Sequence, residues 1–259
     1  MKLRYTTLIS GSSGNASYIE NESDAVLLDG GLSFKELLRL TDTLDISLHK
    51  VRGILLTHEH TDHSKGVGVI SRKLKIPIHT TPGTWERIRG RVGSIPEEHI
   101  RLHRVEDTFL MHSLAVETFP LSHDACEPCG YMVSSAGKKV GFVTDTGWIE
   151  DRLKVRLQSC QGLVVEANHD VAMLRNGSYP YPLIQRILSP KGHLSNVECQ
   201  SLLLDVVGKQ TVAVTLAHLS SENNRPALAF DCVQAVLQGF SQITLSVAPR
   251  YEPLPFVEL

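Results

Sequence analysis

The stretch Thr57-His58-Glu59-His60-Thr61-Asp62-His63 directly follows the apolar run Gly53-Ile54-Leu55-Leu56. Three histidines and one aspartate of this stretch lie within six consecutive positions. The apolar, β-prone run predicts a buried strand, and Ser64-Lys65-Gly66 opens a pattern typical of a helix. The polar stretch is therefore expected on the loop between a strand and a helix, where a rigid scaffold can hold ligands.

Imidazole and carboxylate side chains together suit zinc, manganese and iron, whereas magnesium and calcium prefer oxygen ligands alone. In this loop His58 and His60 can face one ion while Asp62 and His63 face a second. The competing interpretation is a polar loop that is merely rich in histidine. The order His-x-His-x-Asp-His just after a buried strand is unusual, and it favours a metal site.

Hydrophobic patterning predicts strands and helices in alternation, with polar residues at the ends of several strands. The predicted strands are 2–9, 16–20, 25–28, 53–56, 77–79, 114–121, 130–134, 139–144, 163–166, 211–216 and 243–247. Helices are expected after Ser33 as N-cap, through Val67, Ile70 and Leu74, and over 82–89, 197–206 and 226–237. Strands and helices thus appear twice in the same order, which indicates an α/β protein.

The motif His58-x-His60-x-Asp62-His63 resembles the main motif of the metallo-β-lactamase fold superfamily. Further segments, spread over almost the whole chain, resemble its YycJ/WalJ branch. They are Ser10–Asn15, Ser122–Ala125, Thr144–Gly147, Glu166–Asp170, Gly192–Asn196 and His218–Asn224. The resemblance implies an α/β fold of the αβ/βα four-layer sandwich type, with a dinuclear metal site at the edge of the two sheets. Residues 1–259 are expected to form a single domain.

The resemblance also implies a complete ligand set for two divalent ions, which can be zinc, manganese or iron. His58, His60 and His123 would hold one ion, Asp62, His63 and His218 the other, and Asp145 would bridge them. Asp29 would lie beneath the histidines and hold a ring nitrogen of one of them. Two ions about 3.5–4 Å apart lower the pKa of a shared water, so that a bridging hydroxide can act as the nucleophile.

The same resemblance implies catalytic roles for His193, Glu166 and Asp62. In the related tRNA 3′-processing nucleases an acidic residue like Glu166 orients a catalytic histidine, which here would be His193. A protonated histidine opposite the nucleophile can give its proton to an alkoxide that leaves phosphorus, an effect worth about 10²–10⁴ in rate. A thiolate that leaves a thioester needs no such acid.

Several polar residues are candidate phosphate contacts. They are Ser12, Ser13, Asn15, His169, Ser195 and Asn196. The first three lie in the loop 10–15, whose backbone N–H groups form either an anion nest beside the metals or a plain hairpin turn. His169 either contacts a phosphate or has a structural role. The last two precede a predicted helix, so capping of that helix is favoured over substrate contact.

The composition fits one large domain, because the chain has 259 residues, of which 42% are hydrophobic. No apolar run approaches the ~20 residues of a membrane span and no secretory leader is evident, so we expect a cytoplasmic protein without membrane contact. Five cysteines in such a chain argue against a disulfide framework. The pair Cys126-x-x-Cys129 belongs either to an inert loop or to a redox or accessory metal site, and Cys160, Cys199 and Cys232 are expected to pack as small apolar side chains.

The formal net charge of −2 does not by itself favour a nucleic-acid enzyme. Residues 72–104, however, contain eight Lys and Arg residues against three Glu residues. This basic segment either tracks the phosphates of a nucleic acid or forms ordinary solvated helix faces.

These observations favour a two-metal phosphodiesterase, and the YycJ/WalJ resemblance implies a 5′→3′ exonuclease that acts on DNA. The alternative among enzymes is a small-molecule metallo-hydrolase, either a thioesterase like glyoxalase II or a cyclic phosphodiesterase, because the superfamily cleaves several kinds of bond on this site. A metal-binding regulatory protein without turnover is disfavoured by the complete ligand set. The native metal and the oligomeric state stay open.

Overall fold

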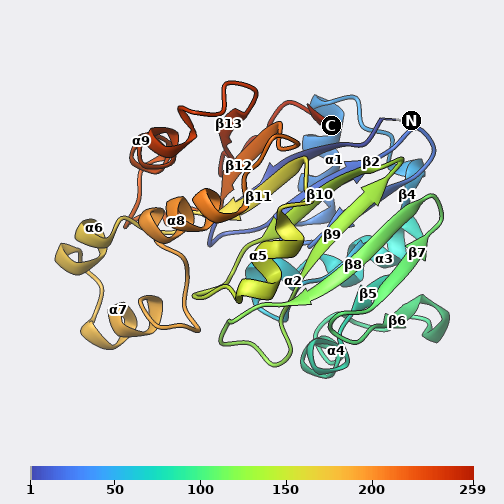
Figure 1. Ribbon diagram of the computed structural model, residues 1–259. Helices are drawn as coiled ribbons and strands as arrows, with labels where there is room; N and C mark the ends of the chain where they lie inside the picture. Colours follow the sequence, from blue (N-terminus) through green and yellow to red (C-terminus); the bar gives the residue numbers. More distant parts are fainter. Residues whose placement is uncertain (1) are drawn as a thin grey trace. The chain divides into compact units, whose positions relative to one another are not determined.

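Two seven-stranded sheets carry the polar loops in the computed structural model, which describes residues 2–259 (Figure 1). The first sheet has the order β14-β1-β2-β3-β4-β5-β6 and the second the order β13-β12-β11-β10-β9-β8-β7. The strands of the first sheet are β1 (Arg4–Ile9), β2 (Ala16–Glu20), β3 (Ala25–Leu28), β4 (Val51–Leu55), β5 (Ile78–Thr80), β6 (Ile100–Leu102) and β14 (Val257–Glu258). Those of the second are β7 (Thr108–Met111), β8 (Leu114–Pro120), β9 (Cys129–Ser135), β10 (Lys138–Val143), β11 (Gly162–Glu166), β12 (Ala213–Ala217) and β13 (Thr244–Val247).

The chain divides into two compact units. The first unit consists of Met1–Pro120, Ala125–Lys138 and Pro249–Glu258, and the second of Leu121–Asp124, Lys139–Ala248 and Leu259. The first unit contains the first sheet and strands β7 to β9, and the second contains β11 to β13 and nearly all of β10. The single domain expected for residues 1–259 stays a prediction.

In the first unit, β3, β4, β5 and β6 are parallel, so their carboxyl ends meet at one edge of the sheet. Leu28 at the end of β3 pairs with Leu55 at the end of β4. The next residue, Asp29, donates its backbone N–H to the Leu55 carbonyl at 2.8 Å. Asp29 has a φ of 61°, a left-handed conformation that turns the chain away from the strand just as the histidine-rich loop begins.

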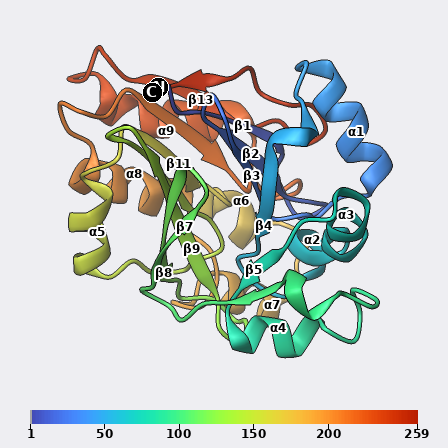
Figure 2. The ribbon, with the colours of Figure 1, turned by 90° about the vertical axis from the view of Figure 1, so that its right-hand side faces the viewer.

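The helices of the first unit pack with the sheet around one apolar core. They are α1 (Phe34–Thr43), α2 (Thr61–Ser64), α3 (Val67–Leu74) and α4 (Pro82–Ile88), with short 3₁₀ turns η1 (Leu48–Lys50) and η2 (Glu97–His99). Leu37 and Leu40 of α1 and Ile70 of α3 are fully buried in this core with Ile54 of β4. Figure 2 shows α1 and α3 on the same side of β4. Each such buried side chain contributes about 1.5–3 kcal/mol, which holds the strand beneath the histidine-rich loop in place.

In the second unit, β10, β11, β12 and β13 are parallel. Their carboxyl ends present Asp145, Glu166 and His218 at one edge of the sheet, since Glu166 pairs with Ala217 in the neighbouring strand. Asp145 and His218 have φ values of 59° and 57°, the same left-handed turn that Asp29 makes after β3. The helices are α5 (Asp151–Leu157), α6 (Val171–Asn176), α7 (Tyr181–Ile187), α8 (Asn196–Val206) and α9 (Pro226–Leu237) (Figure 1).

The elements predicted from the sequence are present, with ends that differ by at most two residues. The β9–β10 hairpin turns at Ala136 and Gly137, whose φ values of 50° and 79° are those of a tight hairpin turn. One expectation was wrong: Thr61–Ser64 is a single helical turn, so Asp62 and His63 lie on a helix rather than on a loop. One turn is too short to show a periodic pattern.

The sequence did not predict β6 and β7, which are short and largely exposed, or the helices α5 to α7. Within residues 2–259, no helix is both long and apolar enough to cross a membrane. The cytoplasmic location stays a prediction.

Candidate metal centre

Asp29 fixes the histidine-rich loop of the first unit from below. Thr57 donates its backbone N–H and its hydroxyl to Asp29 Oδ1, at 2.9 and 3.0 Å. The other carboxylate oxygen, Oδ2, lies 2.8 Å from Nδ1 of His63. All three residues are buried. Asp29 therefore contacts a ring nitrogen of a candidate ligand, which is the contact that the resemblance implied for it.

The hydrogen bonds of this loop also select which nitrogen of each ring can bind an ion. Because the Thr57 hydroxyl donates to Asp29, it accepts from Nδ1 of His58 at 2.9 Å. With Nδ1 as the donor in both His58 and His63, Nε2 is the nitrogen that can bind a metal. The ring of His58 lies 4.6 Å from that of His60 and 4.3 Å from that of His63, measured between centroids. Three imidazoles of the short stretch 58–63 thus converge.

Asn15 reaches this cluster from the loop between β1 and β2. Its Nδ2 lies 3.3 Å from Asp62 Oδ2 and 3.0 Å from His63 Nε2, while its Oδ1 accepts from the Gly11 N–H at 2.9 Å. The amide therefore touches two candidate ligands, whereas the sequence suggested only a phosphate contact. Ser12 and Ser13 are exposed at the tip of the same loop.

In the second unit, four side chains come together at the carboxyl edge of the parallel strands. Asp145, Glu166, His193 and His218 each offer a ligand atom, and these atoms lie within 4.8 Å of one another. Asp145 Oδ1 is 3.5 Å from His218 Nε2 and 3.8 Å from His123 Nε2. Nδ1 of His123 faces the Gly192 carbonyl at 3.1 Å, which again leaves Nε2 as the nitrogen that can bind a metal.

Glu166 connects this group. Its Oε1 lies 2.8 Å from Nδ1 of His193 and 2.8 Å from Nδ1 of His218, while Oε2 accepts from the N–H groups of Thr146 and Leu194. The sequence indicated the contact with His193 but missed the contact with His218. The missing information was the register of β11 and β12, which places Glu166 beside the end of the strand that precedes His218.

The charges of the Glu166 group reinforce one another. Burial alone raises the pKa of Glu166, but His193 and His218 outweigh burial and the pKa of the carboxyl is lowered. For His193, burial lowers the pKa while Glu166 and then Asp145 raise it, and the net pKa is raised. Glu166 is thus held as a carboxylate that favours the protonated form of His193.

Comparison with known proteins assigns the family. Residues 24–214 match the family described as "Beta-lactamase superfamily domain". The exodeoxyribonuclease YycJ of Bacillus anthracis is 39% identical over 238 residues, which cover 92% of this chain and 90% of YycJ. The chain belongs to the metallo-β-lactamase superfamily.

Two further comparisons agree with this assignment, one in sequence and one in fold. The exodeoxyribonuclease WalJ of Streptococcus pneumoniae is 37% identical over 228 residues, which cover 87% of this chain and 85% of WalJ. The Zn²⁺-bound PqqB of Methylobacterium extorquens superposes with a TM-score of 0.73 at 16% identity, covering 97% of this chain and 99% of PqqB, a likeness of fold alone. The predicted metallo-β-lactamase fold and the class of metal-dependent hydrolase are confirmed.

The other candidate residues of this chain have internal contacts. Ser195 caps α8: its hydroxyl accepts from the Glu198 N–H, and the Glu198 carboxylate accepts from the Ser195 N–H in return. Asn196 is buried and pairs with Asn224 through both amides. The ring of His169 is completely buried, and burial lowers its pKa. The phosphate contacts suggested for these residues stay predictions.

The cysteines are not members of the ligand groups found in residues 2–259. All five are free, with Cys129, Cys160 and Cys199 buried, Cys126 exposed and Cys232 partly buried. Burial raises the pKa of Cys129 to about 12, so this thiol stays protonated. In residues 2–259, the groups of side chains that can hold an ion contain no cysteine. Cys126 instead donates its backbone N–H to the Glu59 carboxylate at 2.8 Å, within the first unit.

Proposed function

We propose that this protein is a two-metal-dependent phosphodiesterase, a 5′→3′ exonuclease that acts on DNA. The relatives YycJ and WalJ are exodeoxyribonucleases, which supports DNA as the substrate. The direction of degradation is part of the proposal through the resemblance to the YycJ/WalJ branch.

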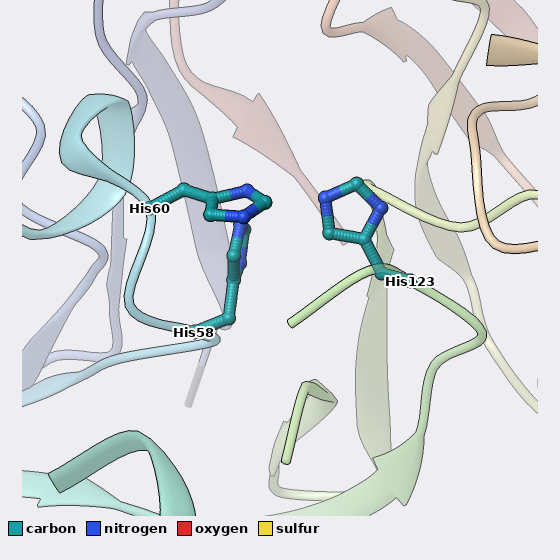
Figure 3. Close-up of side chains that lie close together, drawn as sticks. All are labelled: His58, His60 and His123. Carbon is teal, nitrogen blue, oxygen red and sulfur yellow. The ribbon is translucent and has the colours of Figure 1, made fainter. Parts of the chain in front are cut away.

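We propose the ligand set that the sequence implied. His58, His60 and His123, the side chains drawn in Figure 3, would hold one ion, Asp62, His63 and His218 the other, and Asp145 both. What supports this assignment is a shared feature: in His58, His63, His123 and His218, Nδ1 faces an acceptor of the protein, so that Nε2 can bind a metal. These nitrogen and carboxylate donors fit zinc, manganese or iron. Two such ions, when bound, lower the pKa of a shared water and offset phosphate charge.

The observation that carries the phosphodiesterase proposal is the anchored His193. Its Nδ1 is held by Glu166 at 2.8 Å and lies 3.8 Å from Asp145 Oδ1. The side chain of Glu166 has no exposed surface, whereas that of His193 is 18% exposed. Since Nδ1 is occupied, Nε2 is the atom that can donate a proton to a substrate. In DNA hydrolysis the P–O3′ bond breaks and the departing sugar alkoxide takes that proton, a need that a thiolate leaving group does not have.

Hydrolysis of end-labelled DNA tests the proposal. The Mn²⁺-loaded protein is given double-stranded DNA labelled at the 5′ or at the 3′ end, with His193→Ala as the matched variant. We expect labelled mononucleotides from the 5′ end only, and little product from the variant with its metal content unchanged. Intact DNA with Mn²⁺, Zn²⁺ and Fe²⁺ would contradict the proposal and favour a small-molecule metallo-hydrolase.

A further inference from the structure

In the basic segment 72–104, some Lys and Arg side chains make hydrogen bonds or ion pairs within the protein and others do not. Arg72 donates to the Val92 carbonyl at 2.6 Å, Arg89 pairs with Glu86, and Arg91 donates to the Glu59 carbonyl at 2.9 Å. Arg72 and Arg91 thus connect separate segments, whereas the Arg89 pair lies within one end of α4. Lys73 and Lys75, in contrast, make no hydrogen bond or ion pair through their side chains with any residue of the described chain.

The two unpaired lysines line a cavity of about 510 Å³ in the first unit. His49, Arg52 and His112 line it as well, and no Asp or Glu does. The five basic side chains come from separate places: η1, the start of β4, the end of α3 and the turn between β7 and β8. Arg52 is paired with Asp24 at 2.6 Å, so the two lysines supply the positive charge that is not offset.

Stabilisation of α3 explains only part of this cluster. The helix ends at Leu74 with Lys75 in a left-handed cap, and cations there interact favourably with the carbonyl end of a helix. That effect gives no reason for His49 and His112 to meet the lysines across a cavity. Two unpaired lysines of one segment, joined by imidazoles from two other segments and by no acid, instead offer an anion positive charge together with N–H donors.

The remaining walls of the cavity are apolar. Leu48, Leu74 and Pro77 are partly exposed within it, beside the buried Val51 and Ile76. A bare inorganic anion gains no binding free energy from apolar walls, whereas a sugar or a ring attached to a phosphate gains some by burying its own apolar surface there. The volume lies in the range of about 300–1,000 Å³ that is typical of small-molecule sites.

The cavity is distinct from the metal centre. It lies at the amino end of β4, whereas the histidine-rich loop follows the carboxyl end. The five residues of β4 separate the two by roughly 16 Å at ~3.3 Å per residue. We propose that this cavity is a second site, which binds a free phosphate monoester of nucleotide size, with Lys73 and Lys75 on the phosphate and the apolar wall on the rest of the molecule. This inference does not depend on the proposed nuclease activity.

Thymidine 5′-monophosphate is a suitable probe, followed by amide NMR shifts of the Zn²⁺-loaded protein. We expect shifts at residues 48–52, 73–77 and 112. In Lys73→Glu/Lys75→Glu, the concentration for half-maximal shift should rise about tenfold or more. Lys35→Glu/Lys209→Glu changes the charge equally at two exposed positions elsewhere and should bind as the wild type does. Thermal unfolding of both variants checks that each is folded.

Two simpler ligands test the phosphate contact and the apolar contact one at a time. Thymidine, which lacks the phosphate, should leave these amides unshifted, and inorganic phosphate should bind more weakly than the nucleotide. If thymidine or inorganic phosphate bound as tightly as thymidine 5′-monophosphate, the assigned ligand class would be wrong. If a 5′-phosphorylated oligonucleotide bound more tightly than the mononucleotide, the ligand would not be a free monoester. Absence of shifts at these residues with millimolar nucleotide, or equal shifts in both charge-reversed variants, would overturn the site itself.

Discussion

The two units present their candidate ligands in opposite ways. In the first unit, four of them lie within the contiguous stretch His58–His63, which follows a single strand, β4. In the second, His123, Asp145 and His218 come from separate segments and meet at one edge of a parallel sheet. A contiguous cluster needs only a local turn, whereas the dispersed one depends on strand register over about a hundred residues. The second set is therefore the one that folding must assemble from distant segments.

The two buried carboxylates that support the sets also differ. Asp29 contacts Thr57 and His63, so it acts on the histidine-rich stretch alone. Glu166 contacts His218 and His193, so it joins a proposed ligand to the proposed acid. Loss of Asp29 should therefore affect metal affinity, and loss of Glu166 should affect both affinity and chemistry.

The largest effect is expected for Asp145→Ala. We predict that the variant loses one or both ions and that DNA hydrolysis falls to background, because both proposed ions share this carboxylate. Elemental analysis of metal per chain and the end-labelled assay measure the two effects. Asp205→Ala, which removes an exposed carboxylate paired with Lys154, is the control. If Asp145→Ala retained two ions per chain, Asp145 would not be a ligand that both ions share.

Amide substitutions of the two supporting carboxylates sharpen the comparison. Glu166→Gln and Asp29→Asn should each weaken metal affinity about 10–100-fold, since each loses an acceptor for a candidate ligand. Excess metal should restore the turnover of Asp29→Asn, whereas Glu166→Gln should stay slow because His193 is also released. A titration of activity with Mn²⁺ distinguishes the two variants. If excess Mn²⁺ restored full turnover in both variants, Glu166 would support metal affinity only, as Asp29 does.

A histidine pair away from the ligands should make the first unit sensitive to acid. Nδ1 of His79 lies 2.9 Å from Nε2 of His103, and burial lowers the pKa of His79 from 6.5 to about 3. Below pH 6.5 the unfolded chain binds a proton that the folded chain does not, so stability falls with pH towards that lower value. The loss between pH 7 and pH 5 should be about 2 kcal/mol.

Urea unfolding at these two pH values measures the effect, with His79→Asn as the comparison. The variant keeps a polar partner for His103 but has no imidazole to protonate. Its stability should depend less on pH by that same amount. An identical pH dependence in both proteins would show that His79 does not titrate as its burial requires.

The smallest effects are expected at two helix caps, one in each unit. Ser33 caps α1 and Ser195 caps α8, each through a hydrogen bond to the third residue of its helix. Ser33→Ala and Ser195→Ala should each lower the free energy of unfolding by about 1 kcal/mol, measured by denaturant unfolding. If capping is the whole role of Ser195, KM for DNA should stay the same in both variants. A raised KM in Ser195→Ala alone would indicate a phosphate contact.

The sequence predicted much of the fold because most strands and helices have a clear period. The histidine-rich motif, the apolar strand before it and the caps at Ser33 and Ser195 are local signals, and the structure contains all of them. The single turn α2 and the exposed strands β6 and β7 lack such signals, because short or two-sided polar segments have no apolar face to repeat.

Contacts between segments far apart in the sequence could not be predicted from patterning. The bond from Glu166 to His218 spans 52 positions and that from Asn15 to His63 spans 48, so both depend on strand pairing. The basic segment shows the same limit. Its composition left open a phosphate-tracking face or ordinary solvated helix faces. In the structure Arg72 and Arg91 donate to backbone carbonyls, whereas Lys73 and Lys75 line a cavity.

The role of His193 as the acid is tested most directly by changing the leaving group. The rates of wild type and His193→Ala are compared on DNA and on thymidine 5′-(p-nitrophenyl phosphate), whose phenolate leaves without a proton. We predict that the variant loses about 10²–10⁴ in rate on DNA and much less on the chromogenic ester, with both ions retained. An equal loss on both substrates, or an unchanged rate on DNA, would contradict the account.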